Sequence, residues 1–284
     1  MTLLAVPNFS EGRSAATIEA ARAATENGPA RLLDIHSDAD HHRTVFTLAG
    51  EPGQLAAAVV DLARVAIARI DLRNHDGVHP RVGALDVAPI VYLNEADRGA
   101  ACVEALVEAD MLGEQLNVPV FLYGILAGGR TRAELRQGGP AALKSRVQAG
   151  QLTPDFGPSR VDPSIGAVLV AARPPLVAFN VELAVPATLE TAQAIAALIR
   201  ESGPEGLESV RAIGLWLAET NTAQVSTNVE DHRATPLRAI VEAIARHATP
   251  SAAELVGLAP RAAFDRFPTD LPVRNKRIIE DSLD

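Results

Sequence analysis

The segment 74–86 (NHDGVHPRVGALD) gathers residues whose types suit proton transfer. His75 and His79 are four residues apart, as in zinc-binding helices, but Gly77 and Pro80 oppose a helix here. The proline instead favours extended backbone at His79. A histidine fixed on a rigid loop can accept and return a proton near neutral pH. Taken alone, a loop histidine is more often an ordinary surface residue, so this assignment needs support from other motifs.

A second cluster of ionisable residues spans 36–43 (HSDADHHR) and includes His36, His42 and Arg43. Adjacent imidazoles and carboxylates form metal sites when enough of them converge. No third group of possible ligands with a recognised spacing lies nearby in the sequence. A solvated hairpin turn is therefore the favoured interpretation, and metal binding by the two histidine clusters stays open as the alternative.

A loop near the N-terminus, residues 7–13, contains Asn8, Ser10 and Arg13 just before a predicted helix. Ser10 can be read as the N-cap of that helix. The other interpretation is that the helix N-terminal amides and these three side chains bind an anionic or amide group. The sequence alone does not separate the two.

Polar side chains also alternate along the predicted strand 223–229. Gln224, Ser226 and Asn228 share one face of that strand, and the apolar or β-branched residues between them share the other. Unpaired buried amides cost about 1–3 kcal/mol each, so a polar face suits a ligand-lined cleft. An exposed sheet face is the equally open alternative.

The bulk composition excludes several classes of protein. The 284 residues are 48% hydrophobic, enough to form the core of one large domain or two smaller ones. The net charge of −9 argues against nucleic acid as a partner, because a phosphate backbone requires a basic surface. Cys102 is the only cysteine, which excludes an intrachain disulfide and a cysteine-rich zinc site.

The N-terminal sequence MTLLAVPNF lacks the charged and long apolar regions of a signal peptide. No run of about 18 apolar residues suggests a membrane span. We therefore expect a cytoplasmic location and no membrane partner.

Hydrophobic periodicity predicts one order of elements, βαββαβ, in each half of the chain. In the first half the predicted strands are 3–6, 31–35, 43–48, 84–92 and 118–123, and the predicted helices are 17–25, 54–70 and 96–116. Residues 124–165 are predicted to be a long irregular connection. In the second half the predicted strands are 176–183, 210–217, 223–229 and 254–259, and the predicted helices are 189–200 and one that Thr235 caps.

This repeated order predicts an α+β fold of two ferredoxin-like subdomains, residues 1–175 and 176–284. We expect the ligand in a cleft between them, because clefts between domains are common binding sites.

Six motifs together resemble those of the glutamate formiminotransferase family. They are VPNFSEGR (6–13), RTVFTLAG (43–50), HPRVGALDVAP (79–89), PDFGPS (154–159), FNVEL (179–183) and AQVSTNVED (223–231). They follow in the family's order and spacing over essentially the whole chain, and the combination is specific although each motif alone would be weak.

The resemblance implies a homodimer of two-subdomain α/β chains, a folate channel between the subdomains and no metal. The implied reaction moves a formimino group from N-formimino-L-glutamate to N5 of tetrahydrofolate. A helical cyclodeaminase domain follows in bifunctional relatives and is not expected here.

The resemblance also implies roles for particular residues. His79 matches the family's catalytic histidine, and Arg43 and Arg81 become candidates for binding carboxylates. Asp155 and Asn228 are candidates for contacting the amidine or the pterin. The remaining candidates for substrate or folate binding are Asn8, Ser10, Arg13, His36, His42, Gly83, Asn180, Glu182, Gln224 and Ser226.

Several positions depart from the family pattern. His36 stands where relatives have an acidic residue, His42 where they have asparagine, and Glu182 where asparagine is usual. Between Pro260 and Lys276 we expect only a brief link where relatives have a further helix and strand. These departures leave a different donor or acceptor, such as a formyl compound, as the nearest alternative. A metal-dependent amidine hydrolase and a non-catalytic folate-binding module are the others.

Overall fold

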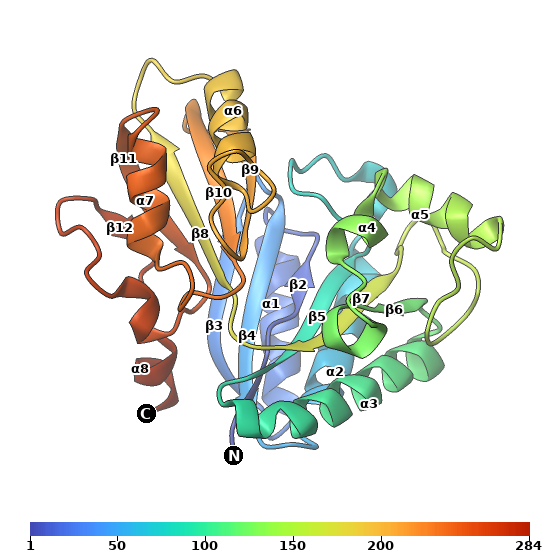
Figure 1. The fold of residues 1–284 in the computed structure, drawn as a ribbon. Coiled ribbons are helices and arrows are strands. Elements are labelled where there is room, and N and C mark those ends of the chain that lie inside the picture. Colours follow the sequence, from blue (N-terminus) through green and yellow to red (C-terminus); the bar gives the residue numbers. More distant parts are fainter. The chain divides into compact units, whose positions relative to one another are not determined.

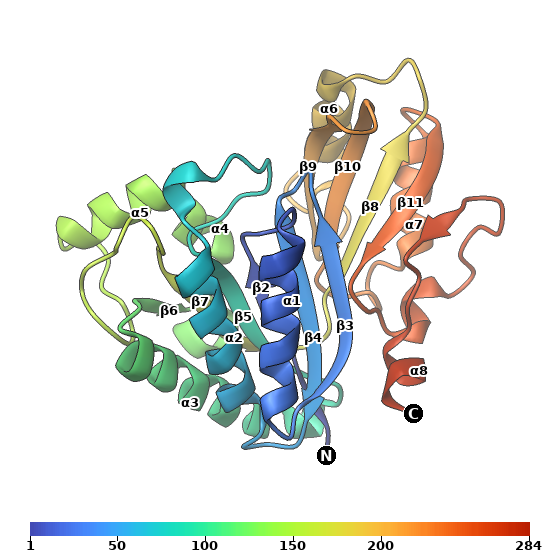
Figure 2. The same ribbon diagram turned by 180° about the vertical axis from the view of Figure 1, so that it is seen from behind.

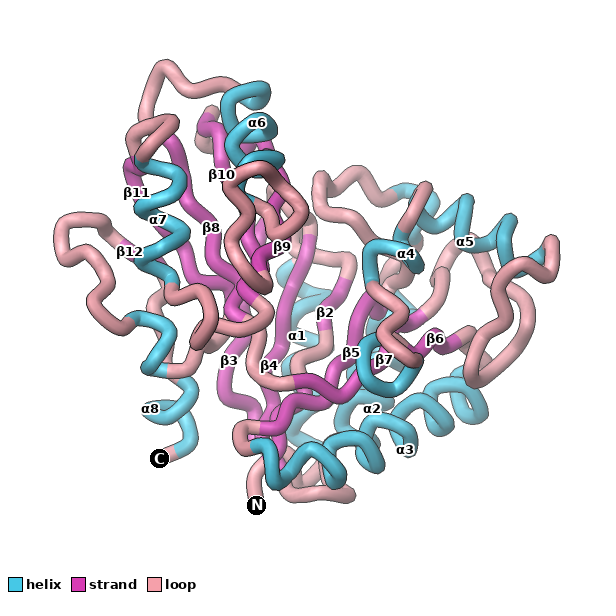
Figure 3. Tube along the Cα trace, viewed as in Figure 1, coloured by secondary structure: helices cyan, strands magenta, loops and turns pink.

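Buried apolar side chains gather separately in two units of the chain, Met1–Arg173 and Pro174–Asp284. A computed structural model describes residues 1–284, and Figures 1 and 3 show the elements of both units. No helix in either unit has the length and the apolar character that crossing a membrane requires.

The first unit combines one mixed sheet with five α-helices. Its strands are β1 (Leu3–Ala5), β2 (Asn8–Phe9), β3 (Arg31–Asp38), β4 (Arg43–Gly50), β5 (Leu85–Tyr92), β6 (Val120–Leu122) and β7 (Val168–Arg173). Its helices are α1 (Ala15–Ala24), α2 (Leu55–Arg69), α3 (Arg98–Leu116), α4 (Arg132–Arg136) and α5 (Gly139–Gln148).

The strands β1 and β2 form one interrupted strand, because both pair with β4 on one side and with β5 on the other. Pro7 lies in the interruption, where it has no N–H to give to the ladder. The sheet order is then β3-β4-β1/β2-β5-β7-β6. The part from β5 to β3 has the order of a ferredoxin-like βαββαβ unit, and β7 and β6 extend it in parallel.

The second unit repeats this order. Its elements are β8 (Val177–Leu183), α6 (Leu189–Ile199), β9 (Val210–Leu217), β10 (Thr222–Val229), α7 (Leu237–Ala245), β11 (Pro250–Val256), β12 (Val273–Arg274) and α8 (Ile279–Leu283). Its sheet runs β12-β11-β8-β10-β9. The prediction of an α+β fold with two ferredoxin-like subdomains is confirmed. The predicted cleft between them stays a prediction.

Helices cover the sheets because alternate strand residues are apolar. In the first unit α1, α2 and α3 pack on one face of the sheet, as Figure 2 shows for α1 and α2, and α5 helps to cover the other face. In the second unit Phe179, Val181 and Val225 point into the core that α6 and α7 close. The opposite face of that sheet therefore carries the polar residues of β8 and β10.

The predicted irregular connection over 124–165 is wrong, because α4 and α5 lie within it. A capping box of Thr131 and Glu134 starts α4. The sequence pattern also predicts no strand at 168–173, where β7 lies. Because β7 lies between two parallel neighbours and is buried on both faces, it reads as an unbroken apolar run without alternation.

Two predicted helix caps are also wrong. Ser14, and not Ser10, caps α1 by accepting a hydrogen bond from the Thr17 N–H. Pro236, and not Thr235, is the N-cap of α7.

The predicted strand 254–259 lies four residues too late, since β11 begins at Pro250. The expected brief link after Pro260 contains a 3₁₀ turn at Arg261–Phe264 and the short strand β12.

Two glutamates on α3 join it to α2 in different ways. The Glu104 carboxylate accepts the backbone N–H groups of Leu55 and Ala56 at 2.9 and 2.8 Å, so it caps the N-terminus of α2 from a neighbouring helix. Glu108, one turn later, is fully buried and neither of its carboxyl oxygens has a hydrogen-bond partner. Burial, and then the charge of Glu104, raise the pKa of Glu108 well above its usual value.

We expect Glu108→Gln to stabilise the protein increasingly as pH rises from about 5 to 8. The folded chain holds a proton on Glu108 that the unfolded chain loses above its ordinary pKa of about 4.3. The stability of the natural chain therefore falls with rising pH, by at most about 1.4 kcal/mol per pH unit from this group, until the raised pKa is passed.

Urea unfolding of both chains across this pH range measures the difference. Glu114→Gln, at an exposed position of the same helix, is the matched control. A difference between Glu108→Gln and the natural chain that does not change with pH would contradict the assignment of a protonated Glu108.

Candidate active site

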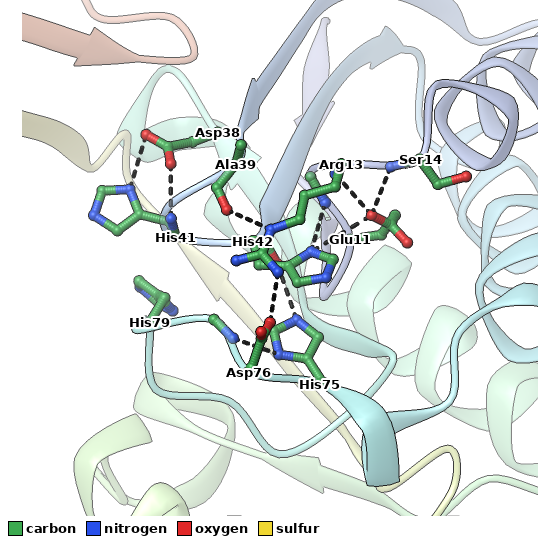
Figure 4. A network of polar contacts seen from close by, with 12 residues as sticks. Glu11, Arg13, Ser14, Asp38, Ala39, His41, His42, His75, Asp76 and His79 are labelled. Atoms are coloured by element: carbon green, nitrogen blue, oxygen red, sulfur yellow. Dashed lines mark hydrogen bonds and ion pairs between the residues drawn. The ribbon is translucent and has the colours of Figure 1, made fainter. Parts of the chain in front are cut away.

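Three segments of the first unit meet at the turn between β3 and β4, namely residues 10–14, 39–42 and 75–81 (Figure 4). Two glycines make this meeting possible. A Cβ atom on Gly12 would lie 2.1 Å from the Asp38 carbonyl oxygen, and one on Gly77 would lie 2.6 Å from the His41 carbonyl oxygen. Because side chains cannot approach backbone this closely, any larger residue at either position would push the turn away.

Two stacked histidines support the meeting point. The rings of His42 and His75 have centroids 4.2 Å apart. Both use Nδ1 as an acceptor, since the Gly12 N–H donates to His42 at 3.0 Å and the Gly77 N–H to His75 at 3.1 Å. Burial lowers the pKa of His75 to about 4 and that of His42 in the same direction. Both rings are therefore neutral near pH 7 and hold the loops in place.

Arg13 and Arg81 also hold the loop that carries His79. Arg13 forms an ion pair with Asp76 at 2.6 Å. Arg81 donates to the carbonyl oxygens of Gly77 at 2.7 Å and His75 at 2.8 Å. Their donors thus bind protein groups in this structure, and a role for them in ligand binding stays a prediction.

His79 does not stand free on its loop, because Arg43 lies against its ring. Arg43 Nη1 is 2.6 Å from His79 Nε2. A guanidinium can only donate, so Nε2 is the acceptor and the neutral ring carries its proton on Nδ1. Burial is the main cause that lowers the pKa of His79 well below its usual value, and the charges of Arg43 and Arg136 add to it.

Arg43 belongs to a group of cations with few anions among them. Its pKa is lowered to about 9, first by burial and then by Arg136, with Arg132 and Arg173 acting in the same direction. Asp86 opposes them and forms an ion pair with Arg136. The Nε atoms of Arg43 and Arg136 are buried and have no hydrogen-bond partner. The partly buried guanidinium groups of Arg43 and Arg136 are suited to an anionic ligand such as a carboxylate.

The turn holds a further histidine that the sequence analysis did not single out. His41 is buried, and its Nδ1 lies 3.1 Å from Asp38 Oδ2. Its ring meets that of His79 edge to face, with centroids 6.2 Å apart. The expectation of a solvated turn is therefore wrong for this residue. The three-residue spacing of Asp38 and His41 in a predicted turn is the sequence signal that could have indicated their contact.

Other predicted residues of this unit lie on β2 and β3 or just after β2. His36 is buried on β3, and burial lowers its pKa. Asn8 Nδ2 donates to the Val6 carbonyl at 2.7 Å, and Ser10 Oγ to the Gly83 carbonyl at 2.7 Å.

Gly83 is packed against backbone, since a Cβ atom there would lie 2.0 Å from the Ala167 carbonyl oxygen. Asp155 contacts β6 instead of the His79 loop. It accepts the Leu122 N–H at 2.8 Å and pairs with Arg130.

The candidates in the second unit share one face of its sheet. Gln224 lies opposite Glu182, and Ser226 opposite Asn180, on the neighbouring strands β10 and β8. Directly opposite residues of an antiparallel pair point to the same side. Asn228 follows on that face, as the alternation predicts.

Glu182 has a side-chain partner in the structure, whereas Gln224 has none. Glu182 is bound by both Nη atoms of Arg274. Gln224 is fully buried, and neither atom of its amide has a hydrogen-bond partner. An unpaired amide of this kind is the feature that a ligand with complementary polar groups would satisfy.

Neither histidine cluster is arranged as a metal centre. No three His, Cys, Asp or Glu side chains of the structure are grouped so that they could hold a metal ion.

Comparison with known proteins identifies the family of the chain. The family model described as "Formiminotransferase domain, N-terminal subdomain" matches residues 2–173, and the one described as "Formiminotransferase domain" matches residues 178–267.

The chain is similar to a glutamate formimidoyltransferase from Streptococcus pyogenes serotype M1, with 36% identity over 91% of this chain and 89% of the relative. A glutamate formimidoyltransferase from Thermoplasma acidophilum is 32% identical over 91% and 88%. The formimidoyltransferase-cyclodeaminase of Gallus gallus is 39% identical over 91% of this chain. The chain spans about half the length of that relative and of the other bifunctional proteins that it matches.

The solved structure of pitrilysin gives a TM-score of only 0.22 at 11% identity, over 87% of this chain and 33% of pitrilysin. This likeness is too weak to indicate a shared fold. The two family models together cover most of the sequence, and their boundary falls close to that between the two structural units. The chain belongs to the formiminotransferase family.

Proposed function

We propose that the chain transfers a formimino group between N-formimino-L-glutamate and N5 of tetrahydrofolate. The observation that carries this proposal is the site around His79, a neutral imidazole on a rigid loop beside buried arginines. The family implies tetrahydrofolate as the co-substrate, and the relatives named glutamate formimidoyltransferase support the same donor.

The reaction requires the transfer of two protons, one from N5 and one to the departing glutamate nitrogen. N5 attacks the amidine carbon, and a tetrahedral intermediate forms. One proton must then leave N5, and one must reach the departing glutamate nitrogen. His79 is the general acid/base of this exchange and accepts the N5 proton at Nε2. General acid–base help contributes about 10²–10⁴-fold, and positioning of the two reactants contributes further.

The arginines explain how His79 becomes available. In the structure Arg43 occupies Nε2, so His79 cannot accept a proton there. A substrate carboxylate among Arg43, Arg132 and Arg136 offers Arg43 a charge-assisted partner that is stronger than a neutral imidazole. Binding of the glutamate part thus draws Arg43 away and frees the base.

The candidates on the sheet of the second unit are assigned to folate binding. The polar face of β8 and β10 offers amide, hydroxyl and carboxyl groups for the pterin and its chain, with Gln224 as the group that most needs a partner. Contacts from Asp155, His36 and His42 to either substrate stay predictions, as do the homodimer and the cytoplasmic location.

A spectrophotometric assay of the purified chain with tetrahydrofolate tests the proposal directly. We expect 5-formimino-tetrahydrofolate to form from N-formimino-L-glutamate. N-formyl-L-glutamate is run in parallel. Transfer from the formyl compound alone would move the assignment to a formyltransferase, and folate binding without transfer from either donor would leave a binding module.

We expect His79→Ala to lower kcat by about 10²–10⁴-fold, because the proton acceptor is lost while the folate contacts remain. Steady-state kinetics together with tetrahydrofolate binding by calorimetry separates the two effects. His247→Ala, at a histidine of the second unit that pairs with Glu205, is the control. A His79→Ala chain that keeps natural turnover would exclude His79 as the general acid/base.

We expect Arg43→Met to raise the pKa of His79 toward its ordinary value of about 6.5, because a neighbouring cation that disfavours the imidazolium is removed. The acid limb of kcat/KM, which requires neutral His79, should then move to higher pH. The KM for the donor should rise about 10–100-fold, since a hydrogen bond to a charged group contributes about 1.5–3 kcal/mol.

NMR titration of the His79 ring and donor kinetics measure these effects. Arg64→Met, which changes an exposed arginine of α2, is the control. An unchanged His79 titration in Arg43→Met would show that Arg43 does not act on the ring.

A further inference from the structure

His41 is held by Asp38 in the way that general acid–base histidines are held. Asp38 Oδ2 lies 3.1 Å from His41 Nδ1, and Asp38 Oδ1 accepts the backbone N–H of His41 at 2.7 Å. The carboxylate thereby fixes both the turn and the ring. A carboxylate on Nδ1 keeps the proton on that nitrogen, orients Nε2 for chemistry and stabilises an imidazolium.

The other ring nitrogen of His41 has nothing to bind. Nε2 is buried and has no hydrogen-bond partner. Leaving a buried polar atom unpaired costs about 1–3 kcal/mol. His75, which has a supporting role, places both of its ring nitrogens on backbone groups. His41 therefore has one ring nitrogen fixed by a carboxylate and the other available to bind a ligand atom.

The two neighbouring histidines contact different charged groups. Arg43 and Arg136 lie near His79 and favour its neutral form. His41 has Asp38 and His36 of β3 and His79 of the neighbouring loop around it, and Asp38 is the anion among these groups.

Burial raises the pKa of Asp38, but its hydrogen bond to His41 and the charge of that ring outweigh burial, so the pKa is lowered and Asp38 is ionised. His41 thus contacts an ionised carboxylate whereas His79 contacts a guanidinium, and two neighbouring titratable groups with such different partners are suited to act as acid and base.

We propose that His41 is the general acid of the transfer, with Nε2–H protonating the departing glutamate nitrogen while His79 Nε2 accepts the proton from N5. This inference rests on the proposed function and divides between two residues the proton transfers that one histidine would otherwise perform. The rings of His41 and His79 are neighbours, with centroids 6.2 Å apart, so one bound substrate can lie within reach of both.

The steps balance in protons and electrons. N5 forms a bond to the carbon of the protonated amidine, and the π electrons of that amidine move onto its terminal nitrogen. His79 takes the proton from N5. His41 gives its proton to the glutamate nitrogen, the bond from carbon to that nitrogen breaks, and the lone pair of the terminal nitrogen restores the amidine. His79 then loses a proton and His41 regains one through solvent before the next turnover.

The test compares the pH dependence of kcat/KM in four chains: the natural sequence, His41→Gln, His79→Gln and Asp38→Asn. A base and an acid give a bell-shaped profile. We expect His79→Gln to lose the acid limb. We expect His41→Gln to lose the alkaline limb and about 10²–10⁴-fold in kcat at little change in KM, because glutamine can donate a hydrogen bond but cannot transfer a proton.

Asp38→Asn should move the alkaline limb to lower pH, since the imidazolium of His41 loses its counterion. NMR titration of the His41 ring without substrate should show the same downward shift. This second measurement does not depend on turnover, and it keeps the proposal testable if His41→Gln unfolds. His247→Gln is the control for the removal of a histidine paired with a carboxylate.

The outcomes separate this inference from the proposed function. A natural chain that transfers the formimino group, with a His41→Gln chain that keeps its rate and both limbs, would overturn the role of His41 alone. A His41 titration that Asp38→Asn leaves unchanged would do the same. A natural chain that transfers nothing from the donor would overturn both the proposed function and the acid role.

Discussion

The turn between β3 and β4 is held between two glycines, and the site depends on this close approach. Gly12 contacts it from the segment before α1, and Gly77 from the loop before β5, at distances that leave no space for a Cβ atom. The turn and its two neighbouring segments therefore lie in direct backbone contact, which larger residues at positions 12 and 77 would prevent. Contact between backbones brings Arg43 at the start of β4 to the ring of His79, although 36 residues separate them in the sequence.

Charge is distributed unevenly over this small region. Arg43 and Arg136, both partly buried, lie near His79, whereas the carboxylate of Asp38 contacts His41. Such an arrangement is costly without a ligand, because like charges repel and several buried nitrogen atoms lack partners. The proposed donor is both an anion and an amidine, so it offers a carboxylate to the arginines and nitrogen atoms to the histidines.

Regular periodicity and family motifs allowed most of the fold and part of the site to be predicted from the sequence. Alternating strands and amphipathic helices gave the βαββαβ order twice, and the family motifs singled out His79 and Arg43, which the structure places in contact. β7 was missed because a strand buried on both faces has no alternation. His41 was missed because its burial and its unpaired nitrogen arise from packing of distant segments, which local spacing does not report.

The carboxylate of Glu104 on α3 accepts hydrogen bonds from backbone N–H groups of α2 that have no acceptor within α2. The first amides of α2 are capped by a side chain of α3 that lies about fifty residues further along the chain. The first turn of α2 is therefore more stable when α3 is docked against it. We expect the protection of the Leu55 and Ala56 amides against hydrogen exchange to report the docking of α3 as well as the local stability of α2.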